Sequence, residues 1–168
     1  MIVTVTKKGV LRWDGQERRA AIGKGGFITA DAKREGDGAS PIGEWPLRYV
    51  YYRPDRVTPP ITALSVQPIS AQMGWCDAPA DPNYNRPVMH PYPGSAEHLW
   101  RDDELYDVIV VLGHNDDPVV PGAGSAIFLH CAKPDYTPTE GCIALKRDDL
   151  LELLSQTQPG DALAILPD

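Results

Sequence analysis

A histidine and a cysteine stand twelve residues apart in the last third of the chain, and both can take part in acyl chemistry. His130 ends the apolar segment SAIFLH, and Cys142 directly follows Thr139, Glu140 and Gly141. A thiol attacks a carbonyl carbon well only as a thiolate, so a catalytic cysteine needs a base or a positive field beside it. We therefore expect Cys142 to be a nucleophile and His130 its general base. The alternative is a turn that contains a buried structural thiol.

The residues around this pair favour the same chemistry. Gly141 permits a tight turn before the cysteine, and such a turn lets backbone N–H groups point at a developing oxyanion. The connection between His130 and Cys142 contains two prolines and can bring its far end back toward the histidine. Cys131 follows His130 directly, and adjacent side chains of a strand face opposite sides. We expect Cys131 to point into the core when His130 points to a cleft.

The elements that must position these residues are mostly strands. Residues 1–6, MIVTVT, alternate apolar and polar side chains as a half-buried strand does, and VLRW at 10–13 continues them as a hairpin. The run LYDVIVVLG at 105–113 is almost continuously apolar, which predicts a central strand covered on both faces. Further strands are expected at residues 47–52, 125–132 and 162–166.

Two segments are expected to be helical and one to be a long loop. RDDLLELLSQT at 147–157 carries four leucines and has acidic residues in its first turn. SAEHLWRDDEL at 95–105 is interpreted as a short helix with Ser95 as its N-cap. Residues 74–95 are dense in Pro, Asn and Asp, and we expect them to form a long, irregular, ordered loop over the cleft.

The composition excludes several classes of partner. The chain has 168 residues, a usual length for one domain, and its net charge of −7 argues against a nucleic-acid partner. No run of about 18 apolar residues is present, so we expect no membrane insertion. The first residues lack the pattern of a secretory signal. This fits a cytoplasmic protein, a signal removed from this chain, or another export route.

The three cysteines raise the question of disulfides and metals. They cannot all pair within one chain, and Cys76 is either free or paired. A zinc site built from His114, His130, Cys131 and Cys142 is an alternative. No Cys-x-x-Cys or His-x-x-x-His spacing supports it. We therefore expect no metal ion and no other cofactor.

Two blocks of the sequence resemble a known family. The stretch from His130 through TEGCI at 139–143 is similar to the signature of L,D-transpeptidases with a YkuD-type catalytic domain: a histidine, a variable loop, Ser/Thr-x-Gly-Cys and an aliphatic residue. GKGGFITADAKREGDGASPIGEW at 23–45 resembles the glycine-rich hairpin near the start of that domain. The order of the blocks and the domain size also fit, so the resemblance covers nearly all of a single catalytic domain, residues 1–168.

The resemblance implies a mostly β, YkuD-like sandwich or barrel with mixed sheets, acting on peptidoglycan stem peptides. In this family the cysteine attacks the carbonyl of an L-centre, a D-amino acid leaves, and the amine of another stem peptide resolves the thioester. Carried over, Cys142 is the nucleophile and His130 the base. Thr139 takes the family's Ser/Thr position, and the amides of Gly141 and Cys142 form the oxyanion hole. A backbone carbonyl can orient the imidazole, so no carboxylate is required.

Three features depart from the family pattern and suggest a divergent branch with altered donor choice. The His-to-Cys spacing is shorter than the common one, so the intervening loop is reduced. Glu140 stands where many members carry histidine, and its charge would raise the pKa of the thiol unless the side chain points away. Ala144 replaces the arginine or asparagine often found two residues after the cysteine.

Six residues are candidates for substrate binding. Arg86 is the best candidate for binding a stem-peptide carboxylate. His114 follows a buried strand, so it either borders the cleft or caps the strand end. Trp75 either forms an aromatic wall of the site or packs its own loop down. The others are Tyr84, His98 and Glu140.

Two other functions fit the same residues. Water in place of the acceptor amine would make an L,D-carboxypeptidase or endopeptidase. Loss of turnover through Glu140 and Ala144 would leave a non-catalytic module that binds the cell wall. The leading hypothesis is the transpeptidase, in the periplasm or cell envelope where its substrate lies, with the cytoplasm as the alternative.

Overall fold

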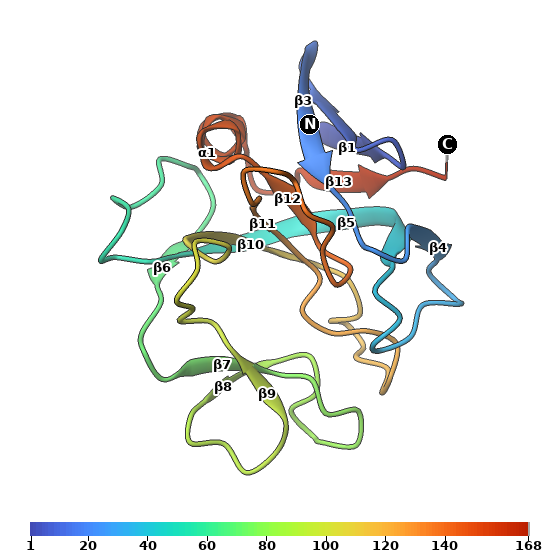
Figure 1. Cartoon of the computed structure of the whole chain (residues 1–168), viewed down its shortest axis with the longest axis vertical. Coiled ribbons are helices and arrows are strands. Elements are labelled where there is room, and N and C mark those ends of the chain that lie inside the picture. Colours follow the sequence, from blue (N-terminus) through green and yellow to red (C-terminus); the bar gives the residue numbers. More distant parts are fainter. Residues whose placement is uncertain (168) are drawn as a thin grey trace.

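The computed structural model describes residues 1–167, and these are mostly β (Figure 1). Strands account for 37% of the chain and helix for 6%, which confirms the expected fold class. The helix expected near the C-terminus is present as α1, Arg147–Gln156. The strands are β1 Ile2–Thr6, β2 Val10–Trp13, β3 Gln16–Ala21, β4 Phe27–Thr29, β5 Ser40–Tyr52, β6 Val66–Pro68, β7 Met73–Cys76, β8 Pro87–Met89, β9 Ala96–His98, β10 Val108–Leu112, β11 Phe128–Cys131, β12 Ile143–Leu145 and β13 Ala162–Ile165.

Most strands belong to one mixed sheet that closes on itself. Its order is β10-β11-β12-β3-β2-β1-β13-β5-β4, with β6 added to β5. The long strand β5 closes the sheet because its segment Gly43–Pro46 pairs with β13 and its segment Leu47–Tyr52 pairs with β10. The pairs β1–β13, β11–β12, β4–β5 and β5–β6 are parallel, and the others are antiparallel. This is the expected sandwich or barrel with mixed strand directions.

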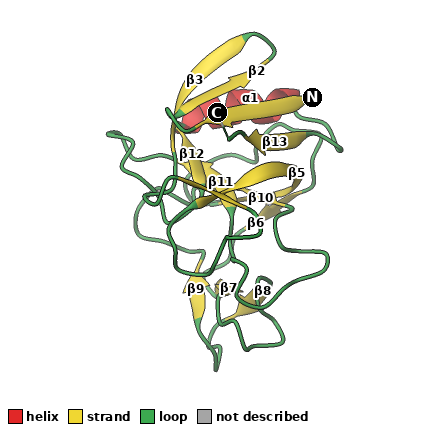
Figure 2. Cartoon of the chain, turned by 90° about the vertical axis from the view of Figure 1, so that its right-hand side faces the viewer, coloured by secondary structure: helices red, strands yellow, loops and turns green. Residues whose placement is uncertain are grey.

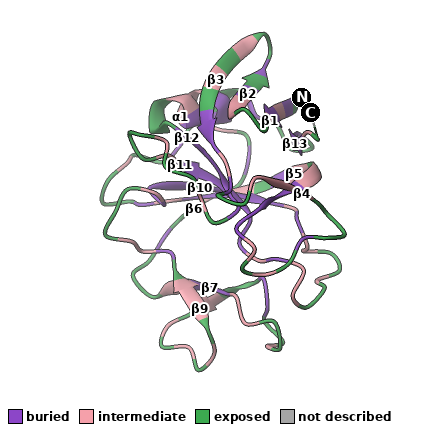
Figure 3. Ribbon diagram, turned by 45° about the vertical axis from the view of Figure 1, so that its right-hand side comes forward, coloured by how far each residue is buried: buried purple, intermediate pink, exposed green. Residues whose placement is uncertain are grey.

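The strand β10 divides the core into two apolar clusters because its side chains alternate between its faces. Val108 and Val110 join the cluster that also contains the buried leucines of α1. Ile109 and Val111 join the cluster around Phe128. Burial of each of the three buried leucines of α1 contributes about 2 kcal/mol, so packing holds this short helix in place. β10 and β11 are buried along their whole length (Figure 3), as expected for central strands.

The segment expected to be a helix at 95–105 is instead the strand β9 followed by an irregular stretch. β9 pairs with β7, which aligns Gly74 with His98, and β8 completes a small three-stranded sheet. The Ser95 hydroxyl donates to Asp77 at 2.6 Å and caps no helix. The long loop expected at 74–95 therefore contains most of β7 and all of β8, and β9 begins directly after it. Figure 2 shows this small sheet at the opposite end of the molecule from β1, β2 and β3.

Candidate active site

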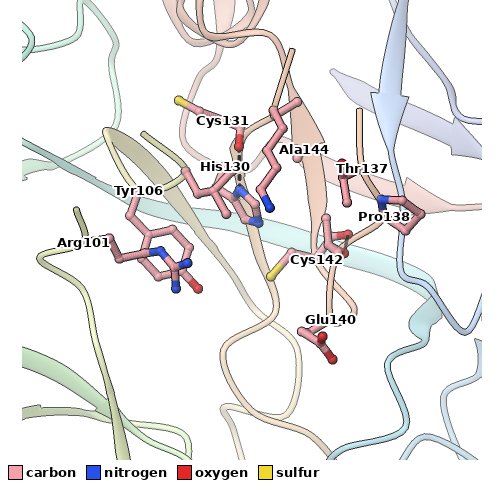
Figure 4. A pocket seen from close by; sticks show the side chains of 13 residues that line it. Arg101, Tyr106, His130, Cys131, Thr137, Pro138, Glu140, Cys142 and Ala144 are labelled. Carbon is pink, nitrogen blue, oxygen red and sulfur yellow. Dashed lines mark hydrogen bonds between the residues drawn. The ribbon is translucent and has the colours of Figure 1, made fainter. Parts of the chain in front are cut away.

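A cavity of about 230 Å³ lies beside β11 and β12, and both His130 and Cys142 line it. β11 and β12 are parallel neighbours, and their register places His130 opposite Ala144. Since Cys142 directly precedes β12, this pairing brings the cysteine to the histidine. Figure 4 shows the imidazole and the sulfur pointing into the same space. The structure thus brings together the two residues on which the sequence analysis depended.

His130 is held as a neutral base. Its Nδ1 lies 2.8 Å from the backbone carbonyl oxygen of Cys131. A carbonyl only accepts hydrogen bonds, so Nδ1 carries the proton and Nε2 is left as the acceptor. Burial lowers the pKa of His130 to about 4, which keeps the ring neutral at pH 7. The side chain of Cys131 faces the other way and belongs to the core, as expected.

Cys142 is a neutral thiol in this arrangement. Its Sγ accepts a hydrogen bond from the Phe128 N–H at 3.3 Å, and the thiol donates to the Ala126 carbonyl at 3.2 Å. Burial raises the pKa of the thiol to about 12. A thiol with a high pKa beside an imidazole with a low pKa does not form an ion pair at rest. The base must therefore take the proton as the sulfur attacks.

Thr139 and Gly141 build the turn that presents the cysteine. The Thr139 hydroxyl donates to the Cys142 carbonyl at 2.6 Å and accepts from the Gly141 N–H at 3.1 Å. Gly141 has φ +133°, and a Cβ there would lie 2.9 Å from the Ala39 carbonyl oxygen, so only glycine fits. The expected oxyanion hole of two amides needs correction, because Thr139 takes the N–H of Gly141. Of the two amides, Gly141 N–H and Cys142 N–H, only the Cys142 N–H is not bound by Thr139.

Glu140 and Ala144, two of the departures from the family pattern, are both accommodated. The Glu140 side chain is exposed and forms an ion pair with Lys24 at 2.8 Å. Among the charges that act on the thiol, Glu97 and Lys33 have larger effects than Glu140. Ala144 is buried and lines the cavity, where its methyl group takes little space.

The other candidates for substrate binding lie away from this cavity. Trp75 and Arg86 border a separate cavity of about 330 Å³, and Trp75 is buried with its ring edge-on to Phe128. The Tyr84 hydroxyl donates to Glu35 at 2.6 Å inside the protein. His114 borders a third cavity, and its buried Nδ1 has no hydrogen-bond partner within residues 1–167. His98 is exposed and stacks on His90. Their roles in substrate binding stay predictions.

Three residues that the sequence analysis did not select line the cavity instead: Arg101, Tyr106 and Lys133. Arg101 forms a bidentate pair with Asp103, at 2.8 and 2.6 Å. The Tyr106 ring lies edge-on to the His130 ring, with 5.3 Å between centroids. No motif marks Arg101 or Tyr106. The sequence predicts a helix and the start of a strand for this segment, and neither pattern indicates the direction in which these two side chains point.

A partly buried carboxyl group supports the Tyr106 hydroxyl. The Tyr106 hydroxyl donates to Glu97 at 2.6 Å. Burial raises the pKa of Glu97 from 4.5 to about 7. The charges of Asp77 and Glu35 act in the same direction, while Tyr106 and Arg101 oppose them. Folding therefore favours the protonated form of Glu97. The contribution of this form to the free energy of unfolding is complete below about pH 4.5 and is lost as the pH rises through 7.

Replacement of Glu97 by glutamine removes this titration while keeping the shape of the side chain. We expect the free energy of unfolding of Glu97→Gln, relative to the unmodified protein, to increase by about 2 kcal/mol between pH 5 and pH 8. Urea unfolding at the two pH values measures the difference. An equal difference at pH 5 and pH 8 would show that Glu97 titrates normally.

No group of three or more His, Cys, Asp or Glu side chains within residues 1–167 could hold a metal ion. No helix in the described part of the chain is long and apolar enough to cross a membrane.

Comparisons with known proteins agree with the motifs. No curated protein matches the sequence. Two similar solved structures are Mycobacterium tuberculosis L,D-transpeptidase 1, 11% identical with a TM-score of 0.46, and an L,D-transpeptidase from Mycobacterium smegmatis, 12% identical with a TM-score of 0.45. Both alignments cover 98% of this chain but only 58% and 57% of those chains, respectively. Residues 1–165 match the model of the YkuD family, described as the L,D-transpeptidase catalytic domain. The chain therefore belongs to the YkuD family of L,D-transpeptidase catalytic domains.

Proposed function

We propose that the protein is a peptidoglycan L,D-transpeptidase that crosslinks stem peptides through a thioester on Cys142. The observation that carries the proposal is the shared cavity of Cys142 and His130, in which the bond from Nδ1 to the Cys131 carbonyl leaves Nε2 free to accept a proton. A neutral base of this kind suits a neutral thiol. Proton transfer then accompanies attack on the carbonyl carbon.

In the first half-reaction the Cys142 sulfur attacks the carbonyl carbon of the L-centre in the donor stem peptide. The thiol proton passes to Nε2 of His130, and the Cys142 N–H donates to the developing oxyanion. The carbon–nitrogen bond then breaks, and the leaving D-amino acid takes the proton from His130. The product is a thioester between Cys142 and the donor.

In the second half-reaction the amine of another stem peptide attacks the thioester carbonyl. His130 accepts the amine proton and returns it to the sulfur as the carbon–sulfur bond breaks. The result is a new amide crosslink and the regenerated thiol. The same site with water as the nucleophile would give hydrolysis, so the identity of the acceptor decides between crosslinking and trimming.

The cavity offers cations for a substrate carboxylate. Arg101 and Lys133 both line it, whereas Arg86 borders a different cavity. Arginine binds carboxylates in a bidentate manner, and the guanidinium of Arg101 is already held in one orientation by Asp103. We therefore propose Arg101, in place of Arg86, for recognition of the stem-peptide carboxylate. Because the substrate is cell-wall peptidoglycan, we place the activity in the cell envelope.

Product analysis with defined muropeptides tests this function. Incubation with a purified tetrapeptide muropeptide is expected to give crosslinked dimers together with a free D-amino acid, detected by mass spectrometry. Trimmed monomers without dimers would instead identify a carboxypeptidase or endopeptidase. An unchanged muropeptide, together with a Cys142 that a carbapenem does not acylate, would point to a wall-binding module.

A further inference from the structure

Ala126 has an unusual backbone conformation and lies beside the nucleophile. Ala126 is buried and has φ +53°, in the left-handed region that residues with a side chain rarely adopt. Its carbonyl accepts the hydrogen bond of the Cys142 thiol at 3.2 Å. Such backbone strain persists only where the surrounding structure holds it, and it is often found at functional sites.

The side chain of Asn85 binds the N–H of Ala126. Its Oδ1 accepts hydrogen bonds from the Ala126 N–H at 3.0 Å and from the Trp75 Nε1–H at 2.9 Å. Its Nδ2 donates to the carbonyls of His114, at 3.1 Å, and Asn115, at 2.7 Å. Both acceptor positions and both donor hydrogens of the amide are therefore used, which fixes its orientation. Asn85 itself has φ +56°, a conformation that asparagine tolerates better than most residues.

The sulfur has a second support that does not involve Asn85. The Phe128 N–H donates to Sγ at 3.3 Å, and Phe128 is fixed by its position in β11, where it pairs with Val111 of β10. The sulfur thus lies between a carbonyl held by Asn85 and an amide held by the sheet. Loss of Asn85 would release the first support and leave the second.

We propose that Asn85 is a positioning residue for the nucleophile, which acts by holding the backbone of Ala126 at its N–H so that the Ala126 carbonyl fixes the Cys142 thiol. Without the Asn85 amide, Ala126 can relax to a negative φ and turn its carbonyl away from the sulfur. The sulfur then loses a fixed direction of approach to the substrate. It also loses the acceptor that stabilises the protonated thiol, while the Phe128 N–H continues to favour the thiolate. This inference relies on the proposed function only in naming Cys142 as the nucleophile.

The charged and titratable groups around the sulfur are not partners of Asn85. Glu97, Lys33 and Glu140 act on the thiol through their charges, and Tyr106 and His130 line the same cavity. None of the hydrogen bonds of the Asn85 side chain reaches any of these five groups. A neutral side chain at position 85 therefore tests the Ala126 backbone and not a change in the charges near the thiol.

The test measures the rate of Cys142 alkylation by iodoacetamide between pH 5 and pH 11 by peptide mass spectrometry. The alkylation midpoint is defined as the pH at which this rate is half of the rate at pH 11. All three cysteines are free and buried, but only the sulfur of Cys142 points into the cavity (Figure 4), so labelling of Cys76 and Cys131 reports unfolding in the same sample. In Asn85→Gly, which tolerates the positive φ, we expect the midpoint of Cys142 alkylation to move to lower pH. We also expect kcat for crosslinking to fall about 10- to 100-fold with little change in KM. A purely structural role of Asn85 would not make the Cys142 sulfur more reactive toward iodoacetamide and at the same time make acyl transfer slower.

A second variant separates the two halves of the amide. Asn85→Asp keeps the acceptor for the Ala126 N–H, and its second oxygen faces the His114 and Asn115 carbonyls. We expect this buried carboxyl to be protonated and to keep at most one of the two donor bonds. We expect its kcat to stay within about threefold of the unmodified protein. Thr157→Val is the matched control, because it removes one buried hydrogen bond, from Oγ1 to the Leu153 carbonyl, at the end of α1. It should leave the alkylation midpoint and kcat unchanged.

Two results would overturn the proposal. One is a folded Asn85→Gly protein with the alkylation midpoint and kcat of the unmodified protein. The other is Asn85→Asp with a kcat as low as that of Asn85→Gly, which would assign the effect to the donor bonds. If the unmodified protein forms no product from muropeptides, the alkylation measurement still tests the role of Asn85, so the two failures are distinguishable.

Discussion

Replacement of Cys142 by alanine is expected to lower crosslink formation from purified muropeptides by about 10⁴-fold or more. The variant loses the sulfur that forms the thioester, and no other thiol can take its place, because Cys131 points into the core and Cys76 lies on β7. The alanine methyl group fits where the cysteine Cβ lies, and only the contacts of Sγ with Phe128 and Ala126 are lost. The fold should therefore survive.

The measurement compares dimer yield by mass spectrometry with thermal unfolding of the same samples. Cys76→Ala is the matched control, because it removes another fully buried thiol that does not line the cavity. It is expected to lower the melting temperature while keeping the crosslinking activity. Dimers formed by Cys142→Ala at the rate of the unmodified protein would exclude Cys142 as the nucleophile.

The parts of the fold that the sequence predicted correctly are those with a strong local pattern. β10 was predicted because five consecutive residues are apolar, and α1 because its leucines and first-turn acidic residues agree. The placement of His130 and Cys142 beside one cavity is predicted for a related reason, since both residues lie within one short motif. The parallel pair β11–β12 then brings them together. Local information was sufficient for these features.

The remainder of the site depends on contacts between distant segments. β9 forms because β7, twenty residues earlier, offers backbone partners, and no periodicity within residues 95–105 shows that partner. The directions of Arg86 and Arg101 depend on this small sheet, so the sequence does not show that Arg101 lines the cavity of Cys142 and that Arg86 lines a different one. Asn85 was missed for the same reason, because its partners lie at positions 75, 114, 115 and 126.

The oxyanion hole shows that a local motif can also mislead. Gly141 before a cysteine predicts a free amide, because glycine permits the turn. In the structure the Thr139 hydroxyl, two residues earlier, accepts from that amide and donates to the Cys142 carbonyl. Ser and Thr side chains often compete for nearby backbone groups in this way. The turn is rigid for this reason, and the Cys142 N–H becomes the candidate donor to the oxyanion.

Replacement of His130 by glutamine is expected to lower kcat by about 10²- to 10⁴-fold, because the variant has no group that accepts the thiol proton. Glutamine has nearly the reach of histidine and can donate to the Cys131 carbonyl, so the fold and the cavity should be kept. KM should change little, since His130 acts on the proton and not on substrate binding. Rapid-quench detection of the thioester separates this step from the attack of the acceptor.

The pH dependence of the unmodified protein gives an independent check on this base. Burial lowers the pKa of His130 to about 4, so Nε2 is available as an acceptor throughout the range above that value. The acidic limb of kcat/KM should therefore lie near pH 4 and not near the ordinary histidine value of about 6.5. Below the limb the ring is protonated at both nitrogens and can take no proton from the thiol. An acidic limb near pH 6.5 would mean that His130 is solvated in the working enzyme, and its persistence in His130→Gln would assign the limb to another group.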